Sequence, residues 1–274
     1  MPFKNAIGFF VKPVSGVTYD PDLLTYIDGL ITPLSAGQLA LLNTMLLYWK
    51  AGLGITNLSD ADDVIYCLAG ETAESSLRNM VKRSHDATAV NAPTFTALEG
   101  FTGDGISGYL DTGYQPSGDG VNFSQNDCSM GVYFRSWVDS FSYAAGVTRY
   151  RRVGILPRSA GDDGLVWLNQ ASSVSYCQDI LEGTGFTIGS RDGATSIDVY
   201  HNKTVQHGTS ISGETPKVYD AYILCVNELG VPTSIIEGQC SLCFFGRSMS
   251  QAQVEAFEDA FEAYMDANGK GVIA

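Results

Sequence analysis

Paired carboxylates are the first chemistry to consider in a chain with 30 acidic residues. Two carboxyl groups about 5 to 10 Å apart on one face can hydrolyse a glycosidic bond, and a strand would place them at positions i and i+2 or i+4. No Glu-x-Asp-x-Glu run of that kind occurs. We expect the densest acidic cluster on the outward, solvated face of a C-terminal helix; it comprises Glu255, Glu258, Asp259 and Glu262. We therefore predict that the chain has no catalytic residues and is not an enzyme.

Nucleophilic and metal-assisted catalysis also lack their usual patterns. No Gly-x-Ser-x-Gly elbow accompanies the three histidines, His85, His201 and His207. Two histidines that flank one hairpin make a poor zinc site without a third ligand. The pair Cys240-x-x-Cys243 lies in a strand-like apolar run, where core packing explains it better than zinc or redox chemistry.

The charge of the chain excludes one class of partner. A formal net charge of −14 works against nucleic-acid binding, which needs clustered Lys and Arg to displace phosphate counterions. The densest basic patch is Arg149-Tyr150-Arg151-Arg152, with Arg158 nearby. We interpret it as a strand end or a contact with an acidic neighbouring subunit. No apolar run approaches the ~18 residues of a membrane span, so we expect no membrane insertion.

Residues 1–60 are predicted to form an N-terminal arm followed by a helical docking segment. Ser35-Ala36-Gly37-Gln38 matches a capping box, and Leu42, Met45 and Trp49 then recur at helical spacing. Such an apolar stripe packs either on the main body of its own chain or on a partner chain. We assign Leu42, Met45 and Trp49 to docking on a partner.

Residues 61–274 carry the pattern of a β-sandwich that ends in a helix. Short apolar runs alternate with glycine-rich turns, and His201-Asn202-Lys203 is typical of a hairpin tip. Because no long helices separate these runs, the fold is predicted to be mainly β, with two facing sheets rather than a parallel βαβ sheet. An amphipathic helix over 248–268 follows, with a capping box at Ser250-Gln251-Ala252-Gln253.

Several segments in a fixed order carry a family resemblance. They are Gly100-Phe101-Thr102-Gly103-Asp104-Gly105, Gly108-Tyr109-Leu110-Asp111-Thr112-Gly113-Tyr114-Gln115-Pro116-Ser117, Asn126-Asp127-Cys128, and Phe245-Gly246-Arg247-Ser248-Met249-Ser250. Over about residues 35–268, this series resembles the laminin-G/concanavalin-like jelly-roll domain of tailed-phage virion structural proteins. The resemblance implies a two-sheet antiparallel jelly-roll sandwich with an N-terminal helical lead-in, and a place in the virion.

The resemblance also makes calcium the cofactor to consider. Laminin-G-like sandwiches often hold one Ca²⁺ at the rim, and Asp104, Asp111 and Asp127 lie in or beside glycine-rich loops. The alternative is that these aspartates form turns with the glycines beside them and need no ion.

On this basis we predict a non-enzymatic structural or accessory protein of a tailed-phage virion: a head fibre, a decoration protein, or a neck or tail component. It would assemble in the host cytoplasm, contact other virion proteins and form a homo-oligomer. The first alternative is a lectin-like adhesin for host-surface glycans, which would bind sugars through exposed aromatic side chains. Candidates for that contact are Tyr114, Trp137, Tyr143, Tyr150 and Trp167. The second alternative is a polysaccharide depolymerase.

Overall fold

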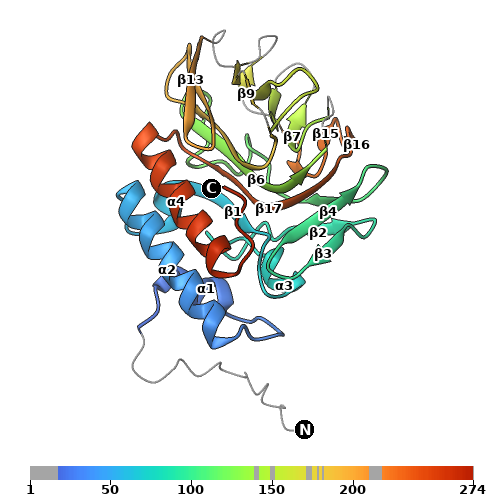
Figure 1. Cartoon of the computed structure of the whole chain (residues 1–274). Coiled ribbons are helices and arrows are strands. Elements are labelled where there is room, and N and C mark those ends of the chain that lie inside the picture. The colour runs from blue at the N-terminus through green and yellow to red at the C-terminus, as the bar shows by residue number, and fades with distance from the viewer. Residues whose placement is uncertain are drawn as a thin grey trace.

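Two β-sheets and a layer of helices make up the protein (Figure 1). The computed structural model describes residues 18–138, 142–148, 152–170, 175–177, 179–180, 182–209 and 218–273. The predicted N-terminal arm, residues 1–17, lies outside the described residues. Within the described part, no helix combines the length and apolarity that a bilayer span requires.

The first sheet, sheet A, has eight strands. In spatial order they are β13 (Thr204–Thr209), β12 (Ser196–His201), β11 (Gly185–Arg191), β6 (Cys128–Trp137), β17 (Glu237–Gly246), β4 (Gly100–Asp104) and β3 (Thr94–Thr96), with β1 (Asp62–Cys67) also paired to β17. All of these pairs are antiparallel. The hairpin predicted at 201–203 is confirmed: Asn202 and Lys203 join β12 to β13 with positive φ angles of 46° and 68°, as a tight hairpin turn requires.

The second sheet, sheet B, has nine strands. In order they are β10 (Ser175–Cys177), β9 (Gly164–Gln170), β8 (Arg152–Leu156), β7 (Ala145–Thr148), β14 (Tyr222–Ile223), β5 (Tyr109–Asp111) and β2 (Thr88–Val90), with β15 (Val226–Glu228) and β16 (Val231–Thr233) attached beside β7. Among the strand pairs of the described residues in this sheet, only β15–β7 is parallel. Two facing, mainly antiparallel sheets confirm the predicted mainly β sandwich fold.

The core of the sandwich lies between the two sheets. Alternation along each strand directs one set of side chains inward, so that Val166 and Leu168 of β9 enter this core while Trp167 points to the opposite face. Cys240 and Cys243 of β17 are both buried in the same core. Residues three apart would face opposite ways on a regular strand, but a β-bulge between them shifts the register.

A helical layer covers the outer face of sheet A (Figure 1). It contains α1 (Pro21–Ile27), α2 (Ala36–Leu53) and α4 (Gln251–Ala267); a short helix α3 (Ala73–Ser76) and a 3-10 turn η1 (Leu58–Asp60) lie in the segments around β1. Ser35 caps α2 by accepting a hydrogen bond from the Gln38 amide, and Gly54 ends it with φ 67°. The observed α4 falls within the predicted helix 248–268.

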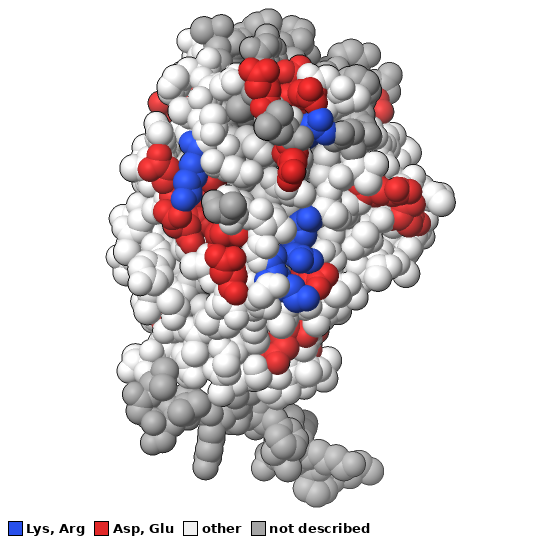
Figure 2. Space-filling view, in the orientation of Figure 1, with Lys and Arg blue, Asp and Glu red and all other residues white. Residues whose placement is uncertain are grey.

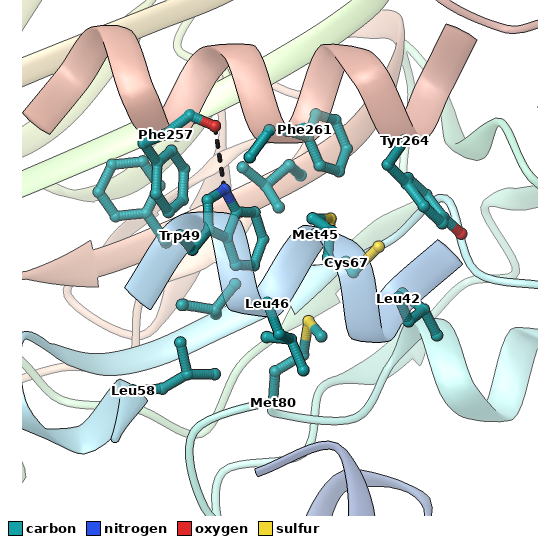
Figure 3. Close-up of a cluster of buried hydrophobic side chains, with 14 of the residues drawn as sticks. Leu42, Met45, Leu46, Trp49, Leu58, Cys67, Met80, Phe257, Phe261 and Tyr264 are labelled. Atoms are coloured by element: carbon teal, nitrogen blue, oxygen red, sulfur yellow. Dashed lines mark hydrogen bonds between the residues drawn. The ribbon is translucent and has the colours of Figure 1, made fainter. Parts of the chain in front are cut away.

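Trp49 joins the two long helices (Figure 3). Its ring stacks on Phe257 of α4 with centroids 4.5 Å apart and planes 6° apart, and its Nε1 donates to the Phe257 carbonyl at 2.9 Å. Phe244 of β17 and Phe186 of β11 pack against the same Phe257 ring from sheet A. The helical segment before residue 60 and the sandwich after residue 61 therefore share one hydrophobic cluster.

A buried ion pair fixes α1 to α2. Lys50 lies 2.6 Å from Asp20 and 2.7 Å from Asp22, and all three side chains are largely shielded from solvent. Burial alone would lower the pKa of Lys50, but hydrogen bonds to the two carboxylates outweigh it and raise that pKa. The only charged side chain of α2 is thus directed inward.

Candidate functional site

The residues predicted to dock on a partner lie inside the chain itself. Leu42, Met45 and Trp49 are all buried in the cluster that α2 shares with α4 and sheet A. Of the two alternatives for this stripe, packing on the main body of the same chain is the one observed. The assignment to partner docking is corrected accordingly, because these side chains have no surface left for another protein.

The aspartates predicted to bind calcium are not brought together as one site. Asp104 accepts hydrogen bonds from the amides of Ile106, Ser107 and Gly108, which lowers its pKa below the ordinary range. Asp111 accepts from the Gly113 amide, and Asp127 accepts from the Ser248 amide. Asp104 and Asp111 thus stabilise two separate turns, and Asp127 joins the segment before β6 to the segment before α4.

No group of three or more potential metal ligands of the His, Cys, Asp or Glu type occurs within the described ranges. The alternative of turn formation without an ion therefore explains Asp104 and Asp111 better than a shared calcium site does, and the contact with the Ser248 amide accounts for Asp127.

The outer face of sheet B differs from that of sheet A. Leu110 and Ile223 belong to the core between the sheets, so their neighbours Tyr109, Asp111 and Tyr222 lie on the opposite face. Tyr222 is directly opposite Asp111 in the β14–β5 ladder, and its ring lies 4.7 Å from that of Tyr109. No described helix contributes to this cluster.

Burial and neighbouring charges shift the pKa values of the ionisable side chains around these tyrosines. Burial raises the pKa of Asp111, and the nearby carboxylate of Asp220 adds to that rise. Burial likewise raises the pKa of Tyr109 and Tyr222 above the ordinary value for tyrosine. Two hydroxyl groups and two carboxylates thus lie beside an aromatic pair, and both carboxylates are half-exposed.

A second aromatic pair lies on the same face. The ladder places Trp167, Gly154, Gly146 and Tyr222 directly opposite one another across β9, β8, β7 and β14. Tyr143 packs edge-on against Trp167 with centroids 4.7 Å apart. Because strands lie about 4.8 Å apart, Trp167 and Tyr222 are about 14 Å apart across the sheet.

The two glycines have no side chains to fill the space between the aromatic pairs. Gly146 has φ 128°, and a Cβ there would come within 2.1 Å of the Val153 carbonyl oxygen, so no other residue fits without a shift of the backbone. We call this set, Tyr143, Trp167, Gly154, Gly146, Tyr222, Tyr109, Asp111 and Asp220, the aromatic row.

The sequence identified only part of the aromatic row. Tyr143 and Trp167 were among the predicted sugar-contacting residues, whereas Tyr109 and Tyr222 were not. Of the other candidates, Tyr114 is fully buried with its hydroxyl on Asp63, and Trp137 is half-buried and donates to the Arg158 carbonyl.

One predicted sugar-contacting residue and most of the predicted basic patch cannot be placed in the fold. Tyr150, Arg149 and Arg151 lie outside the described residues.

The sequence signal that could have revealed Tyr109 and Tyr222 is the alternation of side chains along a strand. In Tyr109-Leu110-Asp111 and Tyr222-Ile223, the aliphatic residue faces the core and its neighbours must face away from it.

One acidic residue of α4 is placed differently from the expectation. Glu258 was predicted to be solvated, but it is only 1% exposed. The turn of the β12–β13 hairpin lies beside it, and Lys203 of that turn forms an ion pair with the neighbouring Asp259. Burial raises the pKa of Glu258 to about 8, although the Lys203 ammonium group lowers it in part.

This burial predicts a pH dependence of stability. The folded state keeps the Glu258 proton up to about pH 8, whereas the unfolded chain loses it near the ordinary pKa of 4.5. Stability should therefore fall as pH rises through this window, with a slope of about 1.4 kcal/mol per pH unit for each such carboxyl. Asp62, whose pKa burial raises to about 8, should act in the same direction.

We predict that Glu258→Gln makes the chain more stable at pH 8 and reduces this slope, because the amide has no proton to lose. Urea unfolding at several pH values between 5 and 8 measures the free energy of unfolding and its slope with pH. Glu255→Gln, one turn away on the same helix, should keep the wild-type slope. Equal slopes for wild type and Glu258→Gln would contradict the assignment.

Comparison with known proteins supports the fold. No family model matches the chain, and no curated protein matches it in sequence. Among solved structures, the Trypanosoma rangeli sialidase in complex with sialic acid is 12% identical, with a TM-score of 0.51 over 86% of this chain and 40% of that chain. The binding domain of botulinum neurotoxin serotype D is 7% identical, with a TM-score of 0.50 over 74% of this chain and 53% of that chain.

A third similar structure is domain 4 of AbnA, an extracellular arabinanase from Geobacillus stearothermophilus, in complex with arabinotriose. It is 13% identical, with a TM-score of 0.45 over 72% of this chain and 98% of that chain. The chain spans about half or less of the sialidase and toxin chains. At these identities the likeness concerns the fold alone. The shared fold is a β-sandwich.

Proposed function

We propose that this chain is a lectin-like module that binds a glycan on the outer face of sheet B and catalyses no reaction. The observation that carries the proposal is the aromatic row on a sheet face without described helices, while the helical layer closes the corresponding face of sheet A. The rings of Tyr109, Tyr222 and Trp167 are only 8%, 6% and 4% exposed, so a sugar would contact their edges and the half-exposed carboxylates of Asp111 and Asp220.

The chemistry of the row suits a sugar. Aromatic rings pack against the apolar C–H faces of a pyranose, while carboxylates and phenol groups hydrogen-bond its hydroxyls. Tyr109 and Tyr222 supply the rings, and Asp111 and Asp220 supply acceptors beside them. Among the similar structures, the sialidase is in complex with sialic acid and the toxin fragment is a binding domain, which supports a recognition role for a sandwich of this kind.

The same two carboxylates raise the alternative of hydrolysis, since a glycosidase uses a carboxyl pair. We favour binding because the Gly113 amide donates to the Asp111 carboxyl and ties it to its own turn, so that Asp111 is held in place beside the aromatic pair. Asp111 and Asp220 would then orient sugar hydroxyls without transferring a proton.

A glycan array followed by titration of the best oligosaccharide tests the proposal. We expect Tyr222→Ala and Asp111→Asn each to weaken binding about tenfold, which corresponds to about 1.4 kcal/mol. Asp28→Asn, an exposed aspartate after α1, should bind as the wild type does. EDTA should leave binding unchanged, because the three calcium candidates are not brought together in one site.

Binding that persists in both row variants would contradict the placement of the site. Glycan binding that requires calcium would indicate a calcium site formed by residues other than Asp104, Asp111 and Asp127. Release of reducing ends from a polysaccharide by the wild type, lost in Asp111→Asn, would make the chain a depolymerase.

We further propose that this module belongs to a tailed-phage virion, as the motif resemblance over residues 35–268 implies. The sandwich fold is compatible with that role, and the location rests on the resemblance. Mass spectrometry of purified particles from an infected culture should detect the chain at a fixed ratio to the major virion proteins. Its absence from washed particles would contradict the virion role and leave the glycan-binding proposal intact.

A further inference from the structure

We propose that the outer face of α2 is a two-fold interface with a second copy of this chain. This face is the side of α2 that turns away from α4 and sheet A. Its two large side chains are exposed, Leu47 by 51% and Tyr48 by 65%. Its smaller members are Gly37, Ala40, Thr44 and Ala51, all exposed, with Leu41 half-buried beside them.

The helix is apolar on both sides, which is unusual for a helix at a surface. Its inner stripe, which includes Leu42, Met45 and Trp49, is sealed in the core, and the outer stripe repeats the apolar character. Lys50, the only charged residue of α2, points inward to Asp20 and Asp22. A helix that is hydrophobic all round is normally covered on all sides.

The outer stripe is complementary to an inverted copy of itself. When a second α2 is turned end for end about Thr44, each Tyr48 lies opposite the partner's Ala40 and each Ala51 lies opposite the partner's Gly37. Leu47 meets the partner's Leu41, and Thr44 meets Thr44. The largest side chain, Tyr48, therefore faces a small one, while Leu47 and Leu41 form an apolar contact between two leucines beside the central threonines. Gly37 has room for a neighbour, since a Cβ there would meet only its own Ser35 hydroxyl at 4.0 Å.

The charge distribution favours a second copy over a basic partner. Two chains of −14 repel each other over most of their surface, and only an uncharged face lets them approach. Figure 2 shows acidic side chains gathered along α4, while the adjoining surface over α2 is almost free of charge. A basic partner would be drawn to α4, and the α2 face suits an equally neutral surface in a closed, two-fold arrangement.

Sedimentation at micromolar concentration and mild oxidation of variants that each carry one added cysteine test the proposal. The wild type should sediment as a dimer, and Leu47→Glu and Tyr48→Glu should each shift it to monomer with an unchanged circular-dichroism spectrum. Val231→Glu, an equally exposed position on β16, is the matched control and should remain dimeric. Thr44→Cys should cross-link to itself, because the two-fold axis brings its Cβ within the about 4 Å that a disulfide needs.

The pairing can be checked independently of dimer strength. Tyr48→Cys alone should not cross-link, whereas a mixture of Tyr48→Cys and Ala40→Cys chains should. A monomeric wild type would overturn the proposal, as would a dimer that Leu47→Glu leaves intact. Cross-linking of Tyr48→Cys to itself in place of Thr44→Cys would overturn the inverted arrangement.

Discussion

The contact between Trp49 and Phe257 determines which surfaces of this protein remain available. Stacked rings and the bond from the indole N–H to the Phe257 carbonyl join two helices that come from opposite ends of the chain. Phe257 of α4 also packs on Phe186 and Phe244 of sheet A, and the buried side chains of α2 belong to the same hydrophobic cluster. The result is a three-layer body in which helices cover the outer face of sheet A and no described helix packs on the Tyr109 and Tyr222 cluster of sheet B.

Several properties follow from this arrangement. With the outer face of sheet A covered by helices, the proposed glycan site falls on the outer face of sheet B, where the aromatic row lies. Because the inner stripe of α2 is buried within the chain, the proposed contact with another copy is made by the outer stripe, where Leu47 and Tyr48 remain exposed. A glycan site and a self-association face would then lie on different layers of the molecule, so that pairing would leave both glycan sites free. Two sites on one dimer would raise the avidity for a repetitive surface.

Local patterns in the sequence predicted the elements well. Capping residues and apolar spacing located both long helices, and glycine-rich turns between alternating runs predicted two facing sheets. These signals depend on residues that are close together in the sequence, so a single sequence is enough to recognise them. The Trp49 stripe also revealed an apolar face, but nothing in its spacing could say whether Phe257 or another protein covers it.

The features that were missed depend on contacts between distant segments. Asp111 and Asp220 approach each other only because β5 and β14 pair, and no search along one strand would find them. Glu258 appears on the polar side of a helical pattern, yet the turn at Lys203 covers it. Cys240 and Cys243 share one core because of a bulge that their spacing does not encode.

The central claim is that the helices form a third layer which is integral to the sandwich. Native-state hydrogen exchange measures it most directly, because each amide reports the free energy of the opening that exposes it. If the helices are integral, the most protected amides of α2 and α4 should exchange at the same opening free energy as those of β6 and β17. Exchange of the helices at a much lower free energy, while the strands keep their protection, would show that sheet A does not need this cover.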